Sequence, residues 1–127
     1  MKRFLIGFCL VLLVGYVLVA VLNLPTLNVG LLKLRGFCHY CDLTNVNLEE
    51  MDLSGADLFY ANLSDAIIKG AKLSRAILEG ANLTDANLRY APLSNANLGG
   101  ANLSGADLRG AKLKGVNLSD ANLSGAK

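Results

Sequence analysis

The sequence is poor in the side chains from which most active sites are built. Its 127 residues include one histidine, three cysteines, two prolines and no tryptophan. Nucleophilic catalysis pairs a serine or cysteine with a nearby base, and the single histidine, His39, has no serine close to it in the sequence. We therefore expect no catalytic residues, no cofactor and no enzyme activity.

Charge is absent from Phe4 to Leu22. As a helix this segment would span about 28 Å, close to the roughly 30 Å hydrocarbon core of a bilayer. It exceeds the about 7–15 apolar residues of a secretory signal, and no small-x-small cleavage motif follows it. The sequence predicts a retained, single-pass transmembrane helix (a signal-anchor) over residues 1–24, with a cleaved signal as the alternative. Lys2 and Arg3 favour a cytoplasmic N-terminus and a periplasmic or lumenal C-terminal part.

A different regularity occupies the remainder of the chain. From Leu43 to Leu123 every fifth residue is leucine, except for Ile68. An α-helix turns about 100° per residue and would scatter these leucines around its surface. A straight strand would send them alternately to its two faces. The pattern instead predicts short extended segments separated by corners, with the leucine and the residue two before it, usually alanine, pointing inward.

The residues that follow the leucines reveal a longer period. Serine or threonine follows every second leucine, with Lys114 as the one exception, at Thr44, Ser54, Ser64, Ser74, Thr84, Ser94, Ser104 and Ser124. A ten-residue period places like residues above one another only when each coil has an even number of sides. The simplest prediction is a four-sided coil of twenty residues.

The repeats also resemble a known family. Ala-Asn-Leu-Ser-Asp at 61–65, Ala-Asn-Leu-Thr-Asp at 81–85 and Ala-Asn-Leu-Ser-Gly at 101–105 are similar to the A(D/N)LXX consensus of pentapeptide-repeat proteins. This resemblance implies an all-β fold, a right-handed quadrilateral β-helix of about four coils. Members with an N-terminal apolar segment are abundant in cyanobacteria, which implies a bacterial protein of the periplasm or thylakoid lumen. We expect a transmembrane helix at 1–24, a linker and cap at 25–40, and the β-helix at 41–127.

The segment before the repeats is expected to cover the open edge of the first coil, because an uncovered strand edge invites aggregation. The apolar residues available for this cap are Leu27, Leu31, Leu32, Leu34 and Phe37. A short helix lying on the membrane surface is the alternative for the same residues.

Cys38 and Cys41 continue the register backward, at a leucine and an alanine position. Residues three apart across a turn are close enough for a disulfide. Inert buried thiols are the alternative that these residues leave open. Zinc would require a fourth ligand beyond these cysteines and His39, so no metal site is expected. A thioredoxin-type redox pair would need a strand–helix context that the repeats do not provide.

Residues twenty apart should lie above one another on the outer surface. One such ladder is Glu49, Lys69, Arg89 and Arg109, and a small apolar patch is expected around Phe59, Tyr60 and Ile77. We take six residues as a possible partner surface, with an ordinary solvated face as the alternative. They are Phe59, Tyr60, Ile77, Lys69, Arg89 and Arg109.

These features favour a non-enzymatic, membrane-tethered scaffold for protein–protein interaction, with a partner that the sequence does not name. The alternatives are a cytoplasm-facing regulator of an enzyme or DNA-associated machine, and a self-associating element that forms end-to-end homodimers. Nucleic acid is a poor partner, and mimicry of DNA by the solenoid is equally disfavoured. Duplex DNA carries one charge per about 1.7 Å, whereas residues 36–127 hold ten acidic residues against eight basic ones.

Overall fold

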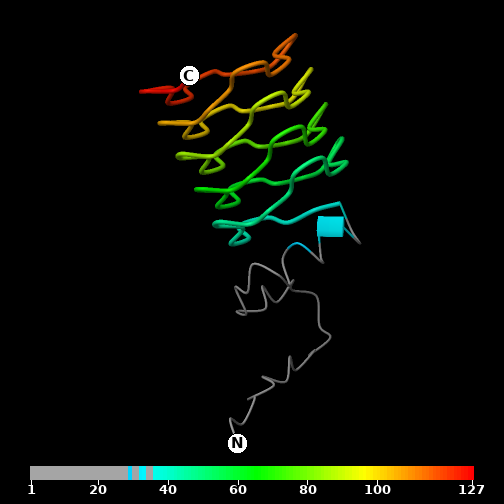
Figure 1. The fold of residues 1–127 in the computed structure, drawn as a ribbon. Coiled ribbons are helices and arrows are strands. Elements are labelled where there is room, and N and C mark those ends of the chain that lie inside the picture. The colour runs from blue at the N-terminus through cyan, green and yellow to red at the C-terminus, as the bar shows by residue number, and fades with distance from the viewer. Residues whose placement is uncertain (1–28, 30–31, 34–35) are drawn as a thin grey trace, which may run out of the picture.

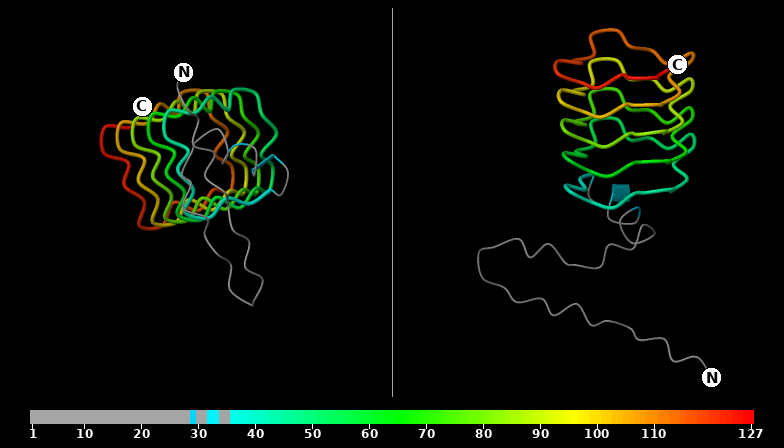
Figure 2. Two further views of the ribbon diagram at one scale, coloured as in Figure 1. Left: turned by 90° about the horizontal axis from the view of Figure 1, so that it is seen from below. Right: turned by 90° about the vertical axis from the view of Figure 1, so that its left-hand side faces the viewer.

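The repeats form a stack of rectangular coils. The computed structural model describes residues 29, 32–33 and 36–127, and Figure 1 shows the coils rising toward the C-terminus. Seen along the axis in Figure 2, successive coils superimpose on one four-cornered outline. Residues pair in parallel with residues twenty positions later, from Phe37 with Asp57 to Asn102 with Asn122. The predicted β-helix with a twenty-residue coil is therefore confirmed.

Each strand is reduced to a single bridged residue, the one before each leucine. Hydrogen bonds link neighbouring coils on both sides of the bridge: Leu43 N donates to Asn62 O at 2.7 Å, and Asn62 N donates to Cys41 O at 2.8 Å. The backbone polar groups on both sides of each bridge in an inner coil are thus satisfied by the coils above and below it. This ladder fixes the spacing between coils.

A tight turn closes each side of a coil. In each turn the leucine carbonyl accepts a hydrogen bond from the residue three positions later, as Leu58 O does from Ala61 N at 3.0 Å. Every fifth residue from Tyr40 to Gly125, the third of its turn, has a positive φ. A type II turn requires this conformation, which suits glycine, asparagine and aspartate. The five-residue period is therefore three extended residues plus the two central residues of one such turn.

The core is one column of side chains inside the coils. The leucine positions from Leu43 to Leu103 and the alanines from Ala56 to Ala106 are all buried. Ile68 fits the column as well as leucine does, at 1% exposure. In the last coil Leu113 and Leu123 are 42% exposed, because within the described residues no further coil lies above them.

The residues that precede the first coil cover part of its lower edge. Leu32 is buried in the core, and Val29 packs against it. Phe37 does not cap the coil, contrary to expectation, because it occupies the outward position before Cys38 and is 47% exposed. Leu27, Leu31 and Leu34 lie outside the described residues, as does the helix predicted for 1–24. No helix in the described part of the chain is long and apolar enough to cross a bilayer.

Asparagine and aspartate before the leucines cap the turns. Asn82 Oδ1, for example, accepts a hydrogen bond from Thr84 N at 3.2 Å. Every Asn or Asp at this repeat position makes the same contact, at 42, 47, 52, 57, 62, 82, 87, 97, 102, 107, 117 and 122. The satisfied N–H makes no hydrogen bond to a neighbouring coil. The motif therefore carries Asn or Asp because its short side chain bonds the backbone two residues on.

Replacing one such cap should destabilise the solenoid measurably. Asn82→Ala removes the acceptor for Thr84 N and for the Thr84 hydroxyl at 2.7 Å, and the donor to Asn62 Oδ1 at 3.0 Å. We expect a loss of about 1–2 kcal/mol in the free energy of unfolding. Asn82→Asp, which keeps the acceptor, should lose less than half of that. Urea denaturation followed by circular dichroism measures both, and an Asn82→Ala protein with an unchanged midpoint would show that the caps do not stabilise the fold.

Candidate interaction surface

Five ring side chains gather on one side of the first two coils. This side, the aromatic side, consists of residues 37–40, 57–60, 77–80, 97–100 and 117–120, which stack on one another. The aromatic patch is defined by Phe37, His39, Tyr40, Phe59 and Tyr60. Ring centroids lie 4.6 Å apart for Phe59–Tyr60, 5.5 Å for the stacked Tyr40–Tyr60 pair and 5.9 Å for His39–Phe59. Tyr40 and Tyr60 remain 60% and 52% exposed.

One tyrosine of the patch, Tyr60, depends on a glycine in the next coil. Tyr60 occupies a positive-φ turn position, at 53°, which bulky residues usually avoid. Its ring lies over Gly80, where a Cβ atom would meet the ring at 2.6 Å. Tyr90 lies over Gly110 in the same way on another side. A tyrosine followed by a glycine twenty residues later is thus the sequence signal for a tyrosine ring that lies flat against the next coil. The five-residue repeat of leucines alone did not reveal this contact.

A histidine–aspartate pair joins the two coils of the patch. His39 Nε2 lies 2.6 Å from Asp57 Oδ2, and both side chains are partly exposed. Asp57 also caps its own turn by accepting from Phe59 N at 3.2 Å. The pair places a polar group beside the rings, as at the rim of many interfaces. No group of residues in the described part of the chain is arranged to hold a metal ion.

The structure joins Cys38 to Cys41 by a disulfide, with their Cα atoms 5.4 Å apart. Cys38 fills the leucine position of its repeat and is buried. The bridge spans the turn that carries His39 and Tyr40. It therefore restrains the backbone of two patch residues.

The six residues predicted as a partner surface fall on two separate sides. Phe59, Tyr60 and Ile77 lie on the aromatic side, and Ile77 pairs with Asp57 as predicted. Lys69, Arg89 and Arg109 lie two sides away, on the basic side, which consists of residues 47–50, 67–70, 87–90 and 107–110. The sequence missed Phe37, His39 and Tyr40 as surface residues because it assigned them to the cap.

The basic side is less positive than its sequence suggests. Lys69 Nζ contacts Glu49 Oε1 at 2.8 Å, and this hydrogen bond raises the pKa of Lys69. The hydrogen bond from the Arg109 guanidinium, at 2.6 Å, holds the pKa of Asp107 well below its usual range. Two of the three predicted like charges are thus neutralised within the chain, and their stacking carries little repulsion.

An open polar depression runs along the side that consists of residues 52–55, 72–75 and 92–95. It is lined by Ser54, Gly55, Ser74, Arg75, Ser94 and Asn95. The serine hydroxyls there have no histidine or carboxylate among the lining residues to act as a base.

Comparison with known proteins indicates the same kind of fold as the structure does. The family model for pentapeptide repeats matches in eight copies, over residues 38–75, 66–105 and 92–127. The chain belongs to the pentapeptide-repeat family. Membership implies the right-handed sense of the β-helix. Pentapeptide-repeat proteins are in general structural or interaction proteins rather than enzymes.

Solved structures of other pentapeptide-repeat proteins are similar to this one. The protein alr5209 from Nostoc PCC 7120 is 48% identical over 68% of this chain and 63% of its own, with a TM-score of 0.52. HetL from Nostoc sp. strain PCC 7120, a protein involved in heterocyst differentiation regulation, is 40% identical over 71% of this chain and 39% of its own, with a TM-score of 0.41. AT2G44920 from the Arabidopsis thaliana thylakoid lumen is 36% identical over 65% and 54%, with a TM-score of 0.43. This pentapeptide-repeat protein therefore spans less than two thirds of each of these relatives. No curated protein matches the sequence.

Proposed function

We propose that this protein is a non-enzymatic scaffold that binds a protein partner through the aromatic patch. The observation that carries the proposal is the cluster of mutually packed rings at Tyr40, Phe59 and Tyr60, in which both tyrosines are exposed and Phe59 is partly exposed. Phe and Tyr are enriched in protein interfaces, and a few packed aromatic residues usually supply most of the binding energy. The His39–Asp57 pair supplies a polar edge for hydrogen bonds.

The patch is suited to binding because its backbone is held in place. The ladder of interstrand hydrogen bonds fixes both coils, and the Cys38–Cys41 bridge restrains the first turn. A surface that is ordered before binding loses little conformational entropy on association. The positions stacked on Tyr60 in the next two coils are Gly80 and Gly100. Tyr60 already covers Gly80, so the open position that a projecting side chain of the partner would fill is the one at Gly100, where nothing lies within 4 Å of an added Cβ atom.

Tyr60 and Tyr90 form a matched pair for testing this surface. Both are about half exposed, both have positive φ, and both lie over a glycine. A photoreactive phenylalanine analogue at position 60, in the full-length protein in its own cells, should give a discrete adduct with one partner. The same analogue at position 90 should not. Once the partner is purified, Tyr60→Asn should weaken its affinity about tenfold, while Tyr90→Asn leaves it unchanged. Equal adducts, or equal affinities, at the two positions would exclude the aromatic patch.

The membrane tether is part of the same proposal. The uncharged run from Phe4 to Leu22 supports a single span, with the repeats on the periplasmic or lumenal side. Detergent, but not high salt, should then release the protein from membranes. Protease should degrade the repeats only after the outer or enclosing membrane is permeabilised. Digestion only after the cytoplasm is opened would instead support the cytoplasm-facing regulator.

A further inference from the structure

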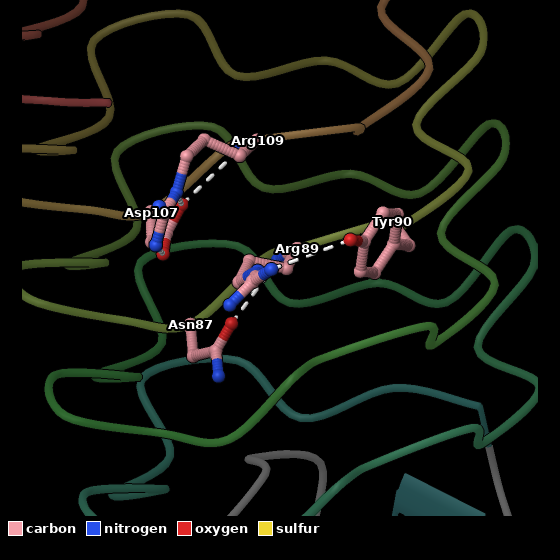
Figure 3. Close-up of polar contacts among 5 residues, drawn as sticks. All are labelled: Asn87, Arg89, Tyr90, Asp107 and Arg109. Carbon is pink, nitrogen blue, oxygen red and sulfur yellow. Dashed lines mark hydrogen bonds and ion pairs between the residues drawn. The ribbon is translucent and has the colours of Figure 1, made fainter.

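The side that carries the polar depression, which we call the serine side, differs from the other sides in its turns. It consists of residues 52–55, 72–75, 92–95 and 112–115. In most turns of the solenoid an Asn or Asp before the leucine acts as a cap, as Asn87 does in Figure 3, where its Oδ1 accepts from Arg89 N at 3.2 Å. On the serine side only Asp52 does so, by accepting from Ser54 N at 3.1 Å. The residues at this position in the next three coils, which have no oxygen to act as a cap, are Lys72, Pro92 and Lys112.

The missing caps leave hydrogen-bond donors without an acceptor in successive coils. The backbone N–H groups of Ser74 and Ser94 make no hydrogen bond to the part of the chain that the structure describes, and neither do their hydroxyl groups. In a capped turn both groups are used, as the Ser64 hydroxyl shows by donating to Asn62 Oδ1 at 3.0 Å. Asn and Asp caps lie on the outer surface, so the N–H groups that they would bond also face outward. An acceptor from outside the chain can therefore take the place of the missing oxygen.

These donors line the open depression. Its lining residues contain hydroxyl groups, a guanidinium and a carboxamide but no carboxylate, and they are Ser54, Gly55, Ser74, Arg75, Ser94 and Asn95. Adjacent strands lie about 4.8 Å apart, so donors from two successive coils can contact one small ligand. Backbone N–H groups that converge in turns form anion-binding concavities in many proteins. The depression thus has the donors of an anion site and no acidic group to oppose one.

The serine side also carries an excess of positive charge. Lys72 Nζ lies 3.5 Å from Asp52 Oδ2, and Asp52 is the one acidic residue of this side. Three more basic residues make no salt bridge within the described residues, and they are Arg75, Lys112 and Lys114. The opposite side has three aspartates and no lysine or arginine, over residues 42–45, 62–65, 82–85, 102–105 and 122–125. The charge of the solenoid therefore directs an anion toward the serine side.

We propose that the depression binds the phosphate group of a phosphorylated ligand, through the N–H and hydroxyl groups of Ser74 and Ser94 and the guanidinium of Arg75. The phosphate oxygens accept the hydrogen bonds that an Asn or Asp cap accepts in other turns. A phosphate monoester has three terminal oxygens and a charge of about −1.5 to −2 at neutral pH, which fits these donors and this excess charge better than the two oxygens and single charge of a carboxylate. The site goes beyond the proposed function, because it lies on another side from the aromatic patch and takes a different kind of ligand.

The repeat itself supplies a variant that closes the site without changing its charge. Pro92→Asn installs the cap that Asn82 makes with Thr84 N, at 3.2 Å, elsewhere in the solenoid. The new oxygen occupies Ser94 N–H, and the variant regains the backbone N–H that proline lacks, so we expect the fold to be kept. Arg75→Gln removes the guanidinium. Arg89→Gln is the matched control, because it makes the same charge change on the basic side.

The measurement is a nuclear magnetic resonance titration of isotope-labelled, full-length protein in non-ionic detergent with inorganic phosphate at constant ionic strength. The amide resonances of Ser74 and Ser94 should shift saturably, and that of Thr84, in a capped turn, should not. Pro92→Asn and Arg75→Gln should each weaken binding about tenfold, and Arg89→Gln less than twofold. The urea midpoint of Pro92→Asn should equal or exceed that of the wild type, which separates loss of the site from loss of the fold.

A second titration distinguishes a soluble phosphate from a lipid headgroup as the source of the group. Phosphatidic acid added to the micelles displaces inorganic phosphate if the site takes a headgroup, and leaves it bound if the ligand is soluble. Wild-type phosphate affinity in Pro92→Asn would overturn the proposal. So would equal shifts with sodium chloride alone, or tighter binding of acetate than of phosphate.

Discussion

Leu83→Ala is expected to lower the free energy of unfolding by about 3–5 kcal/mol, the upper range for leucine truncations in protein cores. Leu83 is fully buried in the middle of the column, between Leu63 and Leu103 of the adjacent coils. The backbone ladder fixes the distance between coils, so the neighbours cannot collapse into the cavity. Urea denaturation of the full-length protein, followed by circular dichroism, gives the value.

Leu123→Ala is the control for this loss. Leu123 occupies the same repeat position two coils later but is 42% exposed. Its truncation removes less buried apolar surface and leaves no enclosed cavity, so we expect a loss of at most about 1 kcal/mol. Losses of similar size at 83 and 123 would mean that the column does not dominate the stability of the coils. Leu83→Ile should be tolerated with a much smaller loss, because Ile68 occupies the same kind of position in the native chain.

Gly80→Ala is expected to be much more harmful than Gly100→Ala. The two glycines stack on one side with nearly the same φ, +65° and +64°, so each alanine bears the same left-handed backbone cost of about 1–2 kcal/mol. They differ in what the new Cβ meets: at Gly100 nothing lies within 4 Å, and at Gly80 the Tyr60 ring lies at 2.6 Å. This overlap should add about 1–3 kcal/mol, because Tyr60 is held by Tyr40 and Phe59.

A double-mutant cycle separates the two contributions. In a Tyr60→Asn background the ring is gone and asparagine tolerates the turn conformation. Gly80→Ala should then cost no more than Gly100→Ala does in the wild type. If the difference between the two glycines persists without Tyr60, the cause lies in the backbone and not in the ring.

The sequence predicted the interior of this molecule far better than its surface. The position of Leu83 in the column and the place of Cys38 in the register follow from the apolar pattern, and the twenty-residue coil follows from the serine and threonine residues after alternate leucines. The repeat of apolar residues in the sequence indicates which side chains point inward, and a narrow core leaves few other ways to pack them. The same repeat does not indicate whether an outward side chain such as Asn82 hydrogen-bonds the backbone, so the turn caps were not predicted.

The charged ladder shows the same limit in another form. The twenty-residue spacing correctly places Lys69, Arg89 and Arg109 in one row, but their surroundings depend on residues two positions earlier. Asp107 and Asn87 differ by one functional group, and as a result Arg109 pairs with a carboxylate in its own repeat whereas Arg89 donates to Tyr90. Tyr40 was assigned to a cap for a related reason, since the first repeat lacks the leucine that marks all later ones except the repeat of Ile68.

Because each side of a coil has five residues, the insertion of repeats during evolution has a simple geometric effect. Phe59 and Arg89 are thirty residues apart, which at twenty residues per coil is one and a half coils, so they face in opposite directions. Insertion of a single pentapeptide between them would turn Arg89 by a quarter of a revolution without disturbing the column of leucines. Insertion of two pentapeptides would bring Arg89 onto the side that carries Phe59. The angle between the two surfaces is therefore set by the number of intervening repeats, in steps of one corner.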